Sequence, residues 1–399
     1  MKNIKRTMAT SAFLITSLAC GTSTNVAWSP SDGQSIPAAI EPSASQQIIF
    51  LGIGEGGIFD PSFTADGQGR VWMSYSAVDP TPLSNAISFI RTRLAYSDDE
   101  GATWTDLGIT LNGSEILTLP PPNEELQAVW QHEVSQLIYD PYAEDEARWK
   151  VFWHEYLAAY DPAVDAKKRL FEHGWIAMQT AADPGGPWSD ARRLFIGRGY
   201  NDVNDASSPG RPEFHLDQLF PAKDQLGRCA AFTEPGVIAR EEGLYISLDC
   251  GTGGDDSKLI LLRCDHALSS CMYLGDWLQD FEAAHFGTSY LGFSASELVE
   301  EQGRFFLFVT PTEDSSHLYR GCMLFEVEDL ENAALMRTDG IPDLLYFLTA
   351  TKGSFNGACG YAQGAPFAGL VYGEKFLTSK SDFQLFASGL TLDDLVPGN

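Results

Sequence analysis

The stretch that decides the fold reads Ser97-Asp98-Asp99-Glu100-Gly101-Ala102-Thr103-Trp104. The side-chain oxygens of Ser97 and Asp99 can accept backbone N–H bonds inside a hairpin loop, so the turn can fold on itself. Gly101 permits a positive φ that other residues resist. Trp104 then begins the next strand, and its ring can wedge between neighbouring sheets. The stretch therefore predicts a self-contained turn between two strands.

Short β-rich runs punctuated by Gly, Asp and Pro recur along the chain, whereas helical periodicity is scarce. Each run is a hairpin of two apolar strands, and the runs lie at 59–76, 130–154, 233–248, 296–309 and, more weakly, 357–386. A small sheet repeated in this way cannot bury its faces alone, so the repeats must pack against one another. The pattern predicts a β-propeller, in which each repeat is one blade.

A weaker copy of the opening turn follows the second hairpin. Its Asp, Gly and Trp keep the relative spacing of the first turn: Asp183, Gly185 and Trp188 beside Asp99, Gly101 and Trp104. Both turns resemble the Asp-box, or BNR repeat, which joins the outer strands of propeller blades in sialidases and related proteins. The resemblance implies a structural role, far from any active centre.

We therefore expect an all-β protein folded as a five-bladed β-propeller, with six blades as the alternative. Residues 46–399 are predicted to form this single domain. The run 47–51 can supply an outer strand to the last blade and close the ring. The stretch 189–232, rich in Gly, Pro, Asn and Asp, is interpreted as an elaborate loop between blades.

The N-terminus has the character of a targeting segment. Basic residues at its start precede a short apolar run, 8–18, that is too short to span a bilayer. The following residues resemble a bacterial lipoprotein signal, which implies cleavage before Cys20 and a lipid on its thiol; ordinary signal-peptidase cleavage is the alternative. Residues 1–20 are thus predicted to be a signal peptide and 21–45 a flexible tether. We expect an exported protein of the bacterial periplasm, outer membrane or cell surface.

Six further cysteines, an even number, suggest disulfides in an exported chain. Cys264 and Cys271 can close a hairpin. The remaining four can join neighbouring strands as Cys229 with Cys250 and Cys322 with Cys359. Six cysteines nevertheless allow 15 pairings, so the connectivity stays open at this point.

The chain is strongly acidic, with a formal net charge of −28. Such a surface repels phosphate backbones, which argues against nucleic acid as a partner. It favours a neutral or cationic ligand. We expect a carbohydrate as ligand or substrate, contact with a membrane only through the N-terminal lipid, and a monomer.

Four of the hairpins begin with a carboxylate near the start of the predicted innermost strand: Asp60, Glu133, Glu234 and Glu297. Because these strands line the central channel, the four carboxylates are expected to face one mouth. Converging carboxylates repel one another and separate in pKa, which divides acid and base roles within one site. Glycoside hydrolysis needs such a pair. Each residue alone can equally be structural, accepting backbone N–H bonds.

Two of these hairpins resemble a known enzyme group. Phe59-Asp60-Pro61-Ser62 resembles the first blade of five-bladed glycoside hydrolases of the family-43 and family-32 kind, where the Asp is the general base. The run 233–238 resembles their third-blade segment, which implies that Glu234 is the general acid. Those enzymes use a second-blade Asp to tune the acid; here Glu133 stands in the matching stretch, a departure from the pattern. Glu297 would be a substrate or support residue.

Other polar and aromatic residues near the second hairpin are candidates for binding a sugar: His132, His154 and Trp130. A structural histidine or a blade-core tryptophan explains them equally well. No cofactor and no dedicated metal site is expected, although a structural calcium or another cation could occupy the channel. The stretch 201–205 has oxygen ligands but lacks the EF-hand spacing.

Two other functions stay open. The first is a non-catalytic surface propeller that binds a glycan or a protein. The second, a lesser one, is a sialidase-like enzyme, whose family grips a carboxylate with three channel arginines. Its N-terminal R-I-P signature is missing, and the arginines available are Arg91, Arg93, Arg211, Arg240 and Arg304.

Overall fold

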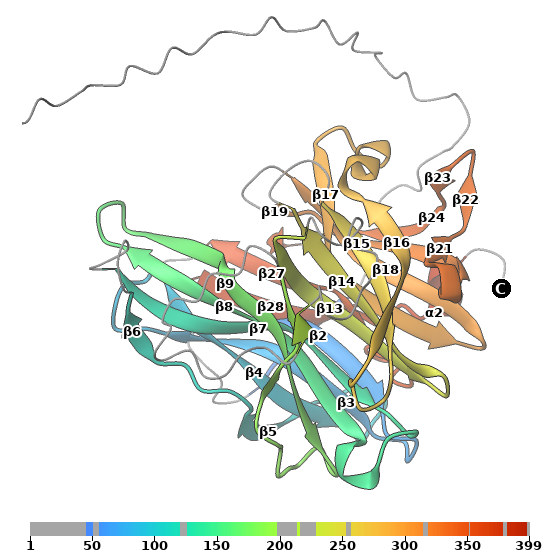
Figure 1. Cartoon of the computed structure of the whole chain (residues 1–399), viewed down its shortest axis with the longest axis horizontal. Coiled ribbons are helices and arrows are strands. Elements are labelled where there is room, and N and C mark those ends of the chain that lie inside the picture. The colour runs from blue at the N-terminus through green and yellow to red at the C-terminus, as the bar shows by residue number, and fades with distance from the viewer. Residues whose placement is uncertain are drawn as a thin grey trace, which may run out of the picture. The chain divides into compact units, whose positions relative to one another are not determined.

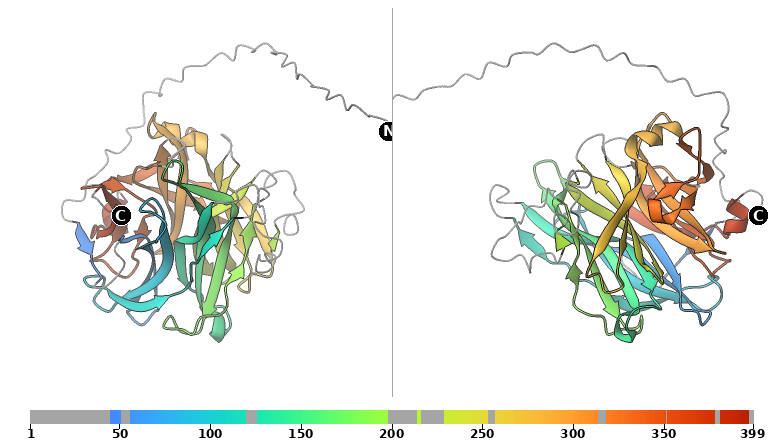
Figure 2. Two further views of the ribbon diagram at one scale, coloured as in Figure 1. Left: turned by 90° about the vertical axis from the view of Figure 1, so that its left-hand side faces the viewer. Right: turned by 45° about the vertical axis from the view of Figure 1, so that its right-hand side comes forward.

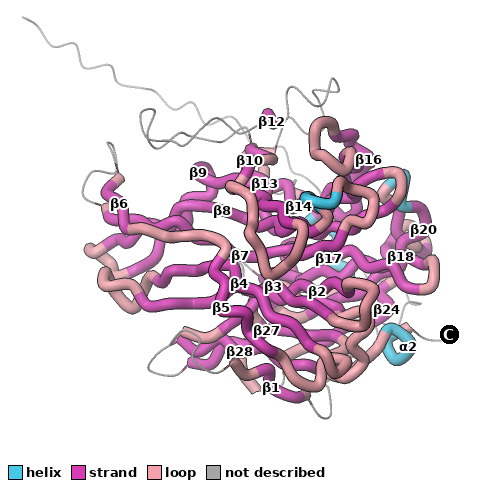
Figure 3. The backbone as a smooth tube through the Cα atoms, turned by 90° about the horizontal axis from the view of Figure 1, so that it is seen from below, coloured by secondary structure: helices cyan, strands magenta, loops and turns pink. Residues whose placement is uncertain are grey.

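A computed structural model of the chain describes residues 45–50, 56–119, 126–197, 214–215, 229–252, 257–313, 318–350, 352–377 and 381–396. In this part of the chain strands dominate and helices are few and short (Figure 3). All described residues belong to the unit Ile36–Asn399, one of two compact units into which the chain divides. The predictions for the signal peptide at 1–20, Cys20, nearly all of the tether and the 201–205 stretch fall outside the described residues.

Five antiparallel sheets of four or more strands follow one another along the described chain (Figure 1). Blade 1 contains β2 (Ile58–Ala65), β3 (Val71–Pro80), β4 (Ser88–Ser97) and β5 (Thr105–Thr110). Blade 2 contains β6 (Ile116–Thr118), β7 (Gln127–Tyr139), β8 (Trp149–Asp161), β9 (Ala166–Ala181) and β10 (Arg192–Arg193). Blade 3 contains β13 (Ala231–Arg240), β14 (Gly243–Gly251), β15 (Lys258–Cys264) and β16 (Cys271–Gln279).

The last two blades carry extra short strands. Blade 4 contains β17 (Tyr290–Glu301), β18 (Arg304–Glu313), β19 (Leu318–Tyr319), β20 (Cys322–Asp329), β21 (Ala334–Leu335) and β24 (Leu344–Leu348). Blade 5 contains β25 (Ser354–Phe355), β26 (Gly360–Tyr361), β27 (Leu370–Leu377), β28 (Ser381–Ala387) and β1 (Gln46–Ile48). Outside the blades lie β11 (Phe195–Ile196), β12 (Phe214–His215), β22 (Arg337–Thr338), β23 (Ile341–Pro342), three 3-10 helices (Asp145–Ala147, Asp280–His285, Leu330–Asn332) and α2 (Leu392–Leu395).

Apolar clusters fill the spaces between successive blades, so each sheet buries both faces against its neighbours. One large cluster lies at each of the five interfaces, including the one between blades 5 and 1. Representative members from the two blades of each interface are Trp72 with Trp149, Phe152 with Phe232, Leu261 with Leu307, Phe308 with Tyr361, and Val371 with Met73. The sheets therefore close into a ring, and the five-bladed propeller expected from the repeats is confirmed.

The ring is closed by a strand from the beginning of the described chain. β1 pairs antiparallel with β28, with Gln46 opposite Ala387 and Ile48 opposite Leu385. The blue first strand accordingly lies beside the red last strands (Figure 2). This is the outer strand that the 47–51 run predicts, although it begins one residue earlier and ends at Ile48.

The turn at 97–104 joins β4 to β5, the two outer strands of blade 1. Asp99 Oδ1 accepts the backbone N–H of Thr103 at 2.8 Å, and Ser97 Oγ accepts that of Gly101 at 2.9 Å. Gly101 has φ +87°, and a Cβ there would lie 2.7 Å from the Cβ of Ala368 in blade 5. The turn therefore folds on its own side chains and also contacts the neighbouring blade.

The stretch 181–188 likewise joins two outer strands, β9 and β10 of blade 2. Asp183 Oδ1 accepts the N–H of Gly185 at 2.7 Å, and Trp188 Nε1 donates to the carbonyl of Pro184 at 3.2 Å. Its position in the blade matches that of the first turn.

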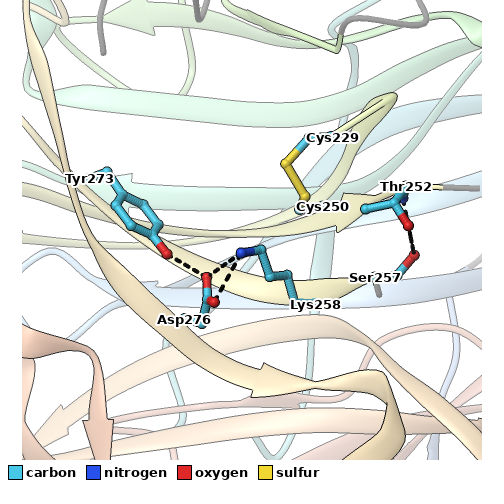
Figure 4. Close-up of a disulfide and its surroundings, with 7 residues drawn as sticks. All are labelled: Cys229, Cys250, Thr252, Ser257, Lys258, Tyr273 and Asp276. Atoms are coloured by element: carbon cyan, nitrogen blue, oxygen red, sulfur yellow. Dashed lines mark hydrogen bonds and ion pairs between the residues drawn. A yellow bond between two sulfur atoms is a disulfide. The ribbon is translucent and has the colours of Figure 1, made fainter. Parts of the chain in front are cut away.

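Three disulfides link the six cysteines in the pairs that the strand spacing favoured. Cys229–Cys250 and Cys264–Cys271 lie in blade 3, whereas Cys322–Cys359 joins blade 4 to blade 5. Beside the first of these, Lys258 Nζ forms an ion pair of 2.9 Å with Asp276 between β15 and β16 (Figure 4). Three disulfides suggest an extracellular or periplasmic protein. Among the described residues, no helix has the length and apolar character that crossing a membrane requires.

Candidate active site

A β-bulge interrupts the innermost strand of each of the first four blades. The register with the next strand shifts between Phe59 and Ser62, Glu133 and Gln136, Thr233 and Gly236, and Ser294 and Glu297. The first bulged residue has a positive φ in every case: Asp60 (52°), Val134 (49°), Glu234 (54°) and Ala295 (52°). Non-glycine residues rarely adopt this conformation, and such strain often marks functional sites. Four blades therefore share one strained position, and two of them place a carboxylate there.

Asp60 joins three blades through its carboxylate. Oδ1 accepts the backbone N–H of Ala358 at 2.7 Å, and Oδ2 accepts that of Val134 at 3.2 Å and the hydroxyl of Ser76 at 3.3 Å. Only 1% of the residue is exposed. Burial raises the pKa of the Asp60 carboxyl well above its usual value, and the charge of Glu133 raises it further.

Glu234 repeats this arrangement between blades 3 and 4. Its Oε2 accepts the N–H of Ala295 at 2.6 Å and the hydroxyl of Ser294, and its Oε1 accepts the hydroxyl of Tyr319 at 3.0 Å. Burial raises the pKa of Glu234, and the charge of Glu133 also raises it, while these hydrogen bonds act in the opposite direction. Asp249 shares the hydroxyl of Ser294 at 3.3 Å, and its own pKa is raised well above the usual value by burial and by Glu234.

Glu133 comes from blade 2, the blade between those of the other two acids. It is one residue before the strained position of blade 2, and the hydroxyl of Tyr156 donates to its Oε1 at 2.5 Å. Because its charge raises the pKa of both Asp60 and Glu234, Glu133 is near enough to each of them to influence their protonation. The structure thus brings together the three acids that the sequence proposed as catalytic.

An open cavity of about 460 Å³ lies over these acids. Asp60 and Glu133 line it directly, and Tyr319, the hydrogen-bond donor to Glu234, forms part of its wall. The remaining wall includes apolar residues, the segment 84–88 and four residues that sequence reasoning missed: Lys167, Arg169, Lys375 and Asn356. A signal for two of them was present, because the run Lys167-Lys168-Arg169 is basic in an acidic chain, and strand alternation puts its first and third residues on one face.

Glu297 does not join the other three carboxylates, so the expected convergence of four is wrong. It lines a second cavity of about 410 Å³, together with Gln136 and Tyr361, and its Oε2 accepts the N–H of Tyr361 at 2.7 Å. The reason is register: the residue of blade 4 equivalent to Asp60 and Glu234 is Ala295, two positions earlier. Burial raises the pKa of Glu297 to about 8.

The proposed sugar-binding residues of blade 2 do not line the cavity over the acids. His132 and His154 are buried, and burial lowers the pKa of each to about 3, so both rings are neutral at physiological pH. His154 stacks on Tyr156 with ring centroids 4.8 Å apart. Trp130 packs on Trp175 at 4.9 Å. Their positions are those of blade-core residues.

The arginines considered for a sialidase-like site are paired elsewhere. Each described one forms a short ion pair with a carboxylate: Arg91 with Asp79, Arg93 with Asp106, Arg240 with Glu242 and Glu300, and Arg304 with Glu326. None of these lines the cavity over the acids, and Arg211 lies outside the described residues. In the described ranges, no group of three or more His, Cys, Asp or Glu side chains is arranged to hold a metal ion.

The sequence matches no family model and no curated protein. Solved structures with a similar fold include a thermostable family-43 glycoside hydrolase (14% identity, TM-score 0.42, 84% of this chain and 90% of that one). A family-32 glycoside hydrolase from Bifidobacterium adolescentis is 11% identical (TM-score 0.48), and the match covers 86% of this chain but only 56% of the other. A family-117 glycoside hydrolase from Zobellia galactanivorans is 13% identical (TM-score 0.46, 88% and 91%).

Proposed function

We propose that this propeller is a glycoside hydrolase that cleaves a glycan by the acid–base chemistry of paired carboxylates. The observation that carries the proposal is the meeting of Asp60, Glu133 and Glu234, from three different blades, beside one open cavity whose wall includes Asp60, Glu133 and the Tyr319 that donates to Glu234. Asp60 would be the general base, Glu234 the general acid and Glu133 the residue that tunes them. The resemblance of the 59–62 and 233–238 stretches to family-43 and family-32 enzymes assigns the same roles.

The pKa shifts suit the proposed general acid better than the proposed general base. A general acid must hold its proton near neutral pH, and burial and the charge of Glu133 raise the pKa of Glu234 in that direction. A general base must lose its proton; two backbone N–H groups act in that direction at Asp60, but burial and the charge of Glu133 outweigh them and raise the pKa of Asp60 well above its usual value. Glu133 raises the pKa of both residues, and the charge of Glu234 also raises that of Asp60, so Asp60 and Glu234 titrate as a coupled set. Such a set can hold one group protonated while another is ionised.

The test is to measure release of reducing ends from a panel of glycans by the wild-type protein and by Asp60→Asn and Glu234→Gln. Each substitution should lower the rate by roughly 10²- to 10⁴-fold, the usual contribution of a general acid or base. Glu297→Gln is the matched control, because it removes a buried channel carboxylate from the other cavity and should keep full activity. Retained hydrolysis in folded Asp60→Asn and Glu234→Gln would refute the assignment.

A second function is favoured by one observation. Both oxygens of Asp60 and of Glu234 already accept hydrogen bonds from neighbouring blades. This is also what a purely structural pair would show, in a non-catalytic propeller that binds a glycan or protein. That function predicts ligand retention by the wild-type protein with no reducing ends released during prolonged incubation.

The proposal also covers the two turns between outer strands and the location of the protein in the cell. The turns at 97–104 and 181–188 would be Asp-box fastenings of the outer strands, remote from the chemistry. Three disulfides suit a protein that is exported, and the N-terminal segment would anchor it through a lipid on Cys20. Metabolic labelling with a fatty acid, lost in Cys20→Ser, tests that anchor. The negative net charge of the whole chain favours a neutral glycan, but most of the charged residues that line the cavity are cations.

A further inference from the structure

The cavity over the acids reverses the charge balance of the chain. The chain as a whole has 54 acidic and 26 basic residues, about two to one. The cavity wall has three cations, Lys167, Arg169 and Lys375, against the two carboxylates of Asp60 and Glu133. Because the pKa of Asp60 is raised by burial and by Glu133, the ionised carboxylates are outnumbered further.

These three cations lack the partners that cations have elsewhere in the described chain. Among the described residues, eleven other arginines and lysines form ion pairs of 2.9 Å or less with carboxylates, from Arg70 with Asp98 to Arg337 with Glu282. Within the described residues, no carboxylate lies within ion-pair distance of the three cavity cations. The one hydrogen bond that these cations make to a described residue runs from Lys167 Nζ to Gln131 Oε1 at 2.8 Å. Lys375 Nζ lies over the ring of Phe383 at 5.2 Å.

The three cations also crowd one another. Burial lowers the pKa of Lys167 to about 8, with the charge of Arg169 acting in the same direction. The pKa of Lys375 is lowered by burial first and by Arg169 second. The charge of Glu133 offsets part of this repulsion at Arg169 and Lys167 without forming an ion pair with either. An anion bound between the cations would offset more of it. A guanidinium is also well suited to bind a carboxylate or sulfate through two parallel hydrogen bonds.

We infer that the cavity takes a glycan bearing an anionic group, a carboxylate or a sulfate ester, and that Arg169 binds this group with help from Lys375 and Lys167. Asn356 and the 84–88 segment supply uncharged polar groups on the same wall. The anionic group would then anchor one sugar while the neighbouring linkage lies over Asp60, Glu133 and Glu234. This inference refines the substrate of the proposed function, and rests on a glycan site rather than on hydrolysis.

The test compares two pairs of probes by calorimetric titration of the full chain. The first pair is an oligogalacturonate and the same oligosaccharide after carboxyl reduction. The second is a sulfated galactan oligosaccharide and its chemically desulfated form. In at least one pair the anionic member should bind ten times or more tightly than its neutral counterpart. Which pair responds tells a carboxylate from a sulfate ester.

The variants are Arg169→Gln and Lys375→Gln, with Lys168→Gln as the matched control. Lys168 is the neighbour of Arg169 on β9 and is exposed, but it does not line the cavity. Arg169→Gln should lose the anionic preference by about 10- to 100-fold, Lys375→Gln should lose part of it, and Lys168→Gln should keep it. Arg169→Lys, which retains the charge without the planar fork, should restore part of the loss.

The inference is overturned if neither pair shows an anionic preference, if no probe binds, or if Arg169→Gln keeps the preference. The same experiments distinguish failure of the anion site from failure of the hydrolase proposal. Tight, Arg169-dependent binding without cleavage would support the anion site and refute hydrolysis. Cleavage of a neutral glycan at equal rates by wild type and Arg169→Gln would support hydrolysis and refute the anion site.

Discussion

Asp60 Oδ1 accepts the backbone N–H of Ala358 at 2.7 Å, although 298 positions separate the two residues in the chain. The bond ties blade 1 to blade 5 at the centre of the propeller, and the second oxygen of the same carboxylate ties blade 1 to blade 2. One side chain therefore belongs both to the candidate catalytic set and to the fastening of the ring. Any substitution of Asp60 acts on two properties at once, and they have to be measured separately.

We predict that Asp60→Asn destabilises the fold by about 1–3 kcal/mol. Asparagine has one acceptor oxygen and an NH₂ group, so either the N–H of Ala358 or that of Val134 would face a donor and stay unsatisfied while buried. Urea unfolding measures the change. Ser76→Ala is the control, because it removes only the 3.3 Å hydroxyl bond to the same carboxylate and should cost about 1 kcal/mol or less. Equal, small costs for the two variants would contradict a fastening role for Asp60.

We predict that Glu297 makes the protein less stable as the pH rises from about 4.5 to about 8. Burial raises its folded-state pKa to about 8 from an ordinary value of 4.5. Between these values the folded state binds the proton and the unfolded state has released it, so the free energy of unfolding falls with rising pH. The slope is at most about 1.4 kcal/mol per pH unit, and it ends above the folded pKa.

The check is to compare urea unfolding of the wild type and Glu297→Gln at pH 5, 6, 7 and 8. A glutamine can still accept the N–H of Tyr361, but it does not titrate. The free energy of unfolding of Glu297→Gln should therefore rise relative to that of the wild type at each step toward pH 8. Parallel pH profiles for the two proteins would show that the carboxyl of Glu297 titrates normally.

We predict that Gly101→Ala costs more stability than Gly69→Ala, although both glycines have a positive φ. A Cβ at Gly101 would lie 2.7 Å from the Cβ of Ala368 in blade 5, whereas a Cβ at Gly69 meets nothing within 4 Å. Both variants bear the backbone strain of about 1 kcal/mol, and only the first forces two blades apart, for about 1–3 kcal/mol more. Thermal unfolding of the two variants side by side gives the difference. Identical losses would mean that the turn does not hold blade 5.

Local patterns in the sequence were enough to predict the propeller scaffold. Alternating apolar strands with Gly and Asp turns located the hairpins. The even number of cysteines suggested disulfides, and their positions next to neighbouring strands suggested the pairs Cys229–Cys250, Cys264–Cys271 and Cys322–Cys359, which the structure contains. These features are short-range or follow from neighbouring strands. Ring closure by β1 was also foreseeable, because a propeller needs one outer strand from the opposite end of the chain.

The register of the site was harder to predict, because a bulge adds a residue that no composition reveals. An acid ahead of an apolar run looks the same whether it occupies the strained position, as Glu234 does, or lies two residues past it, as Glu297 does. The cations were missed for another reason. Arg169 and Lys375 come from β9 and β27, far apart in the chain, and only the closed ring makes them neighbours in one wall.

The strand β1 has a mechanical consequence. It holds blade 5 through three residue pairs with β28, and every residue before it is connected to the propeller through Gln46. Tension along the N-terminal segment of a tethered protein would reach the pair Gln46–Ala387 before any other part of the ring. Load applied there acts on hydrogen bonds, whereas the joint between blades 4 and 5 carries the covalent link Cys322–Cys359. Under such a pull the ring should open first at its outer edge in blade 5.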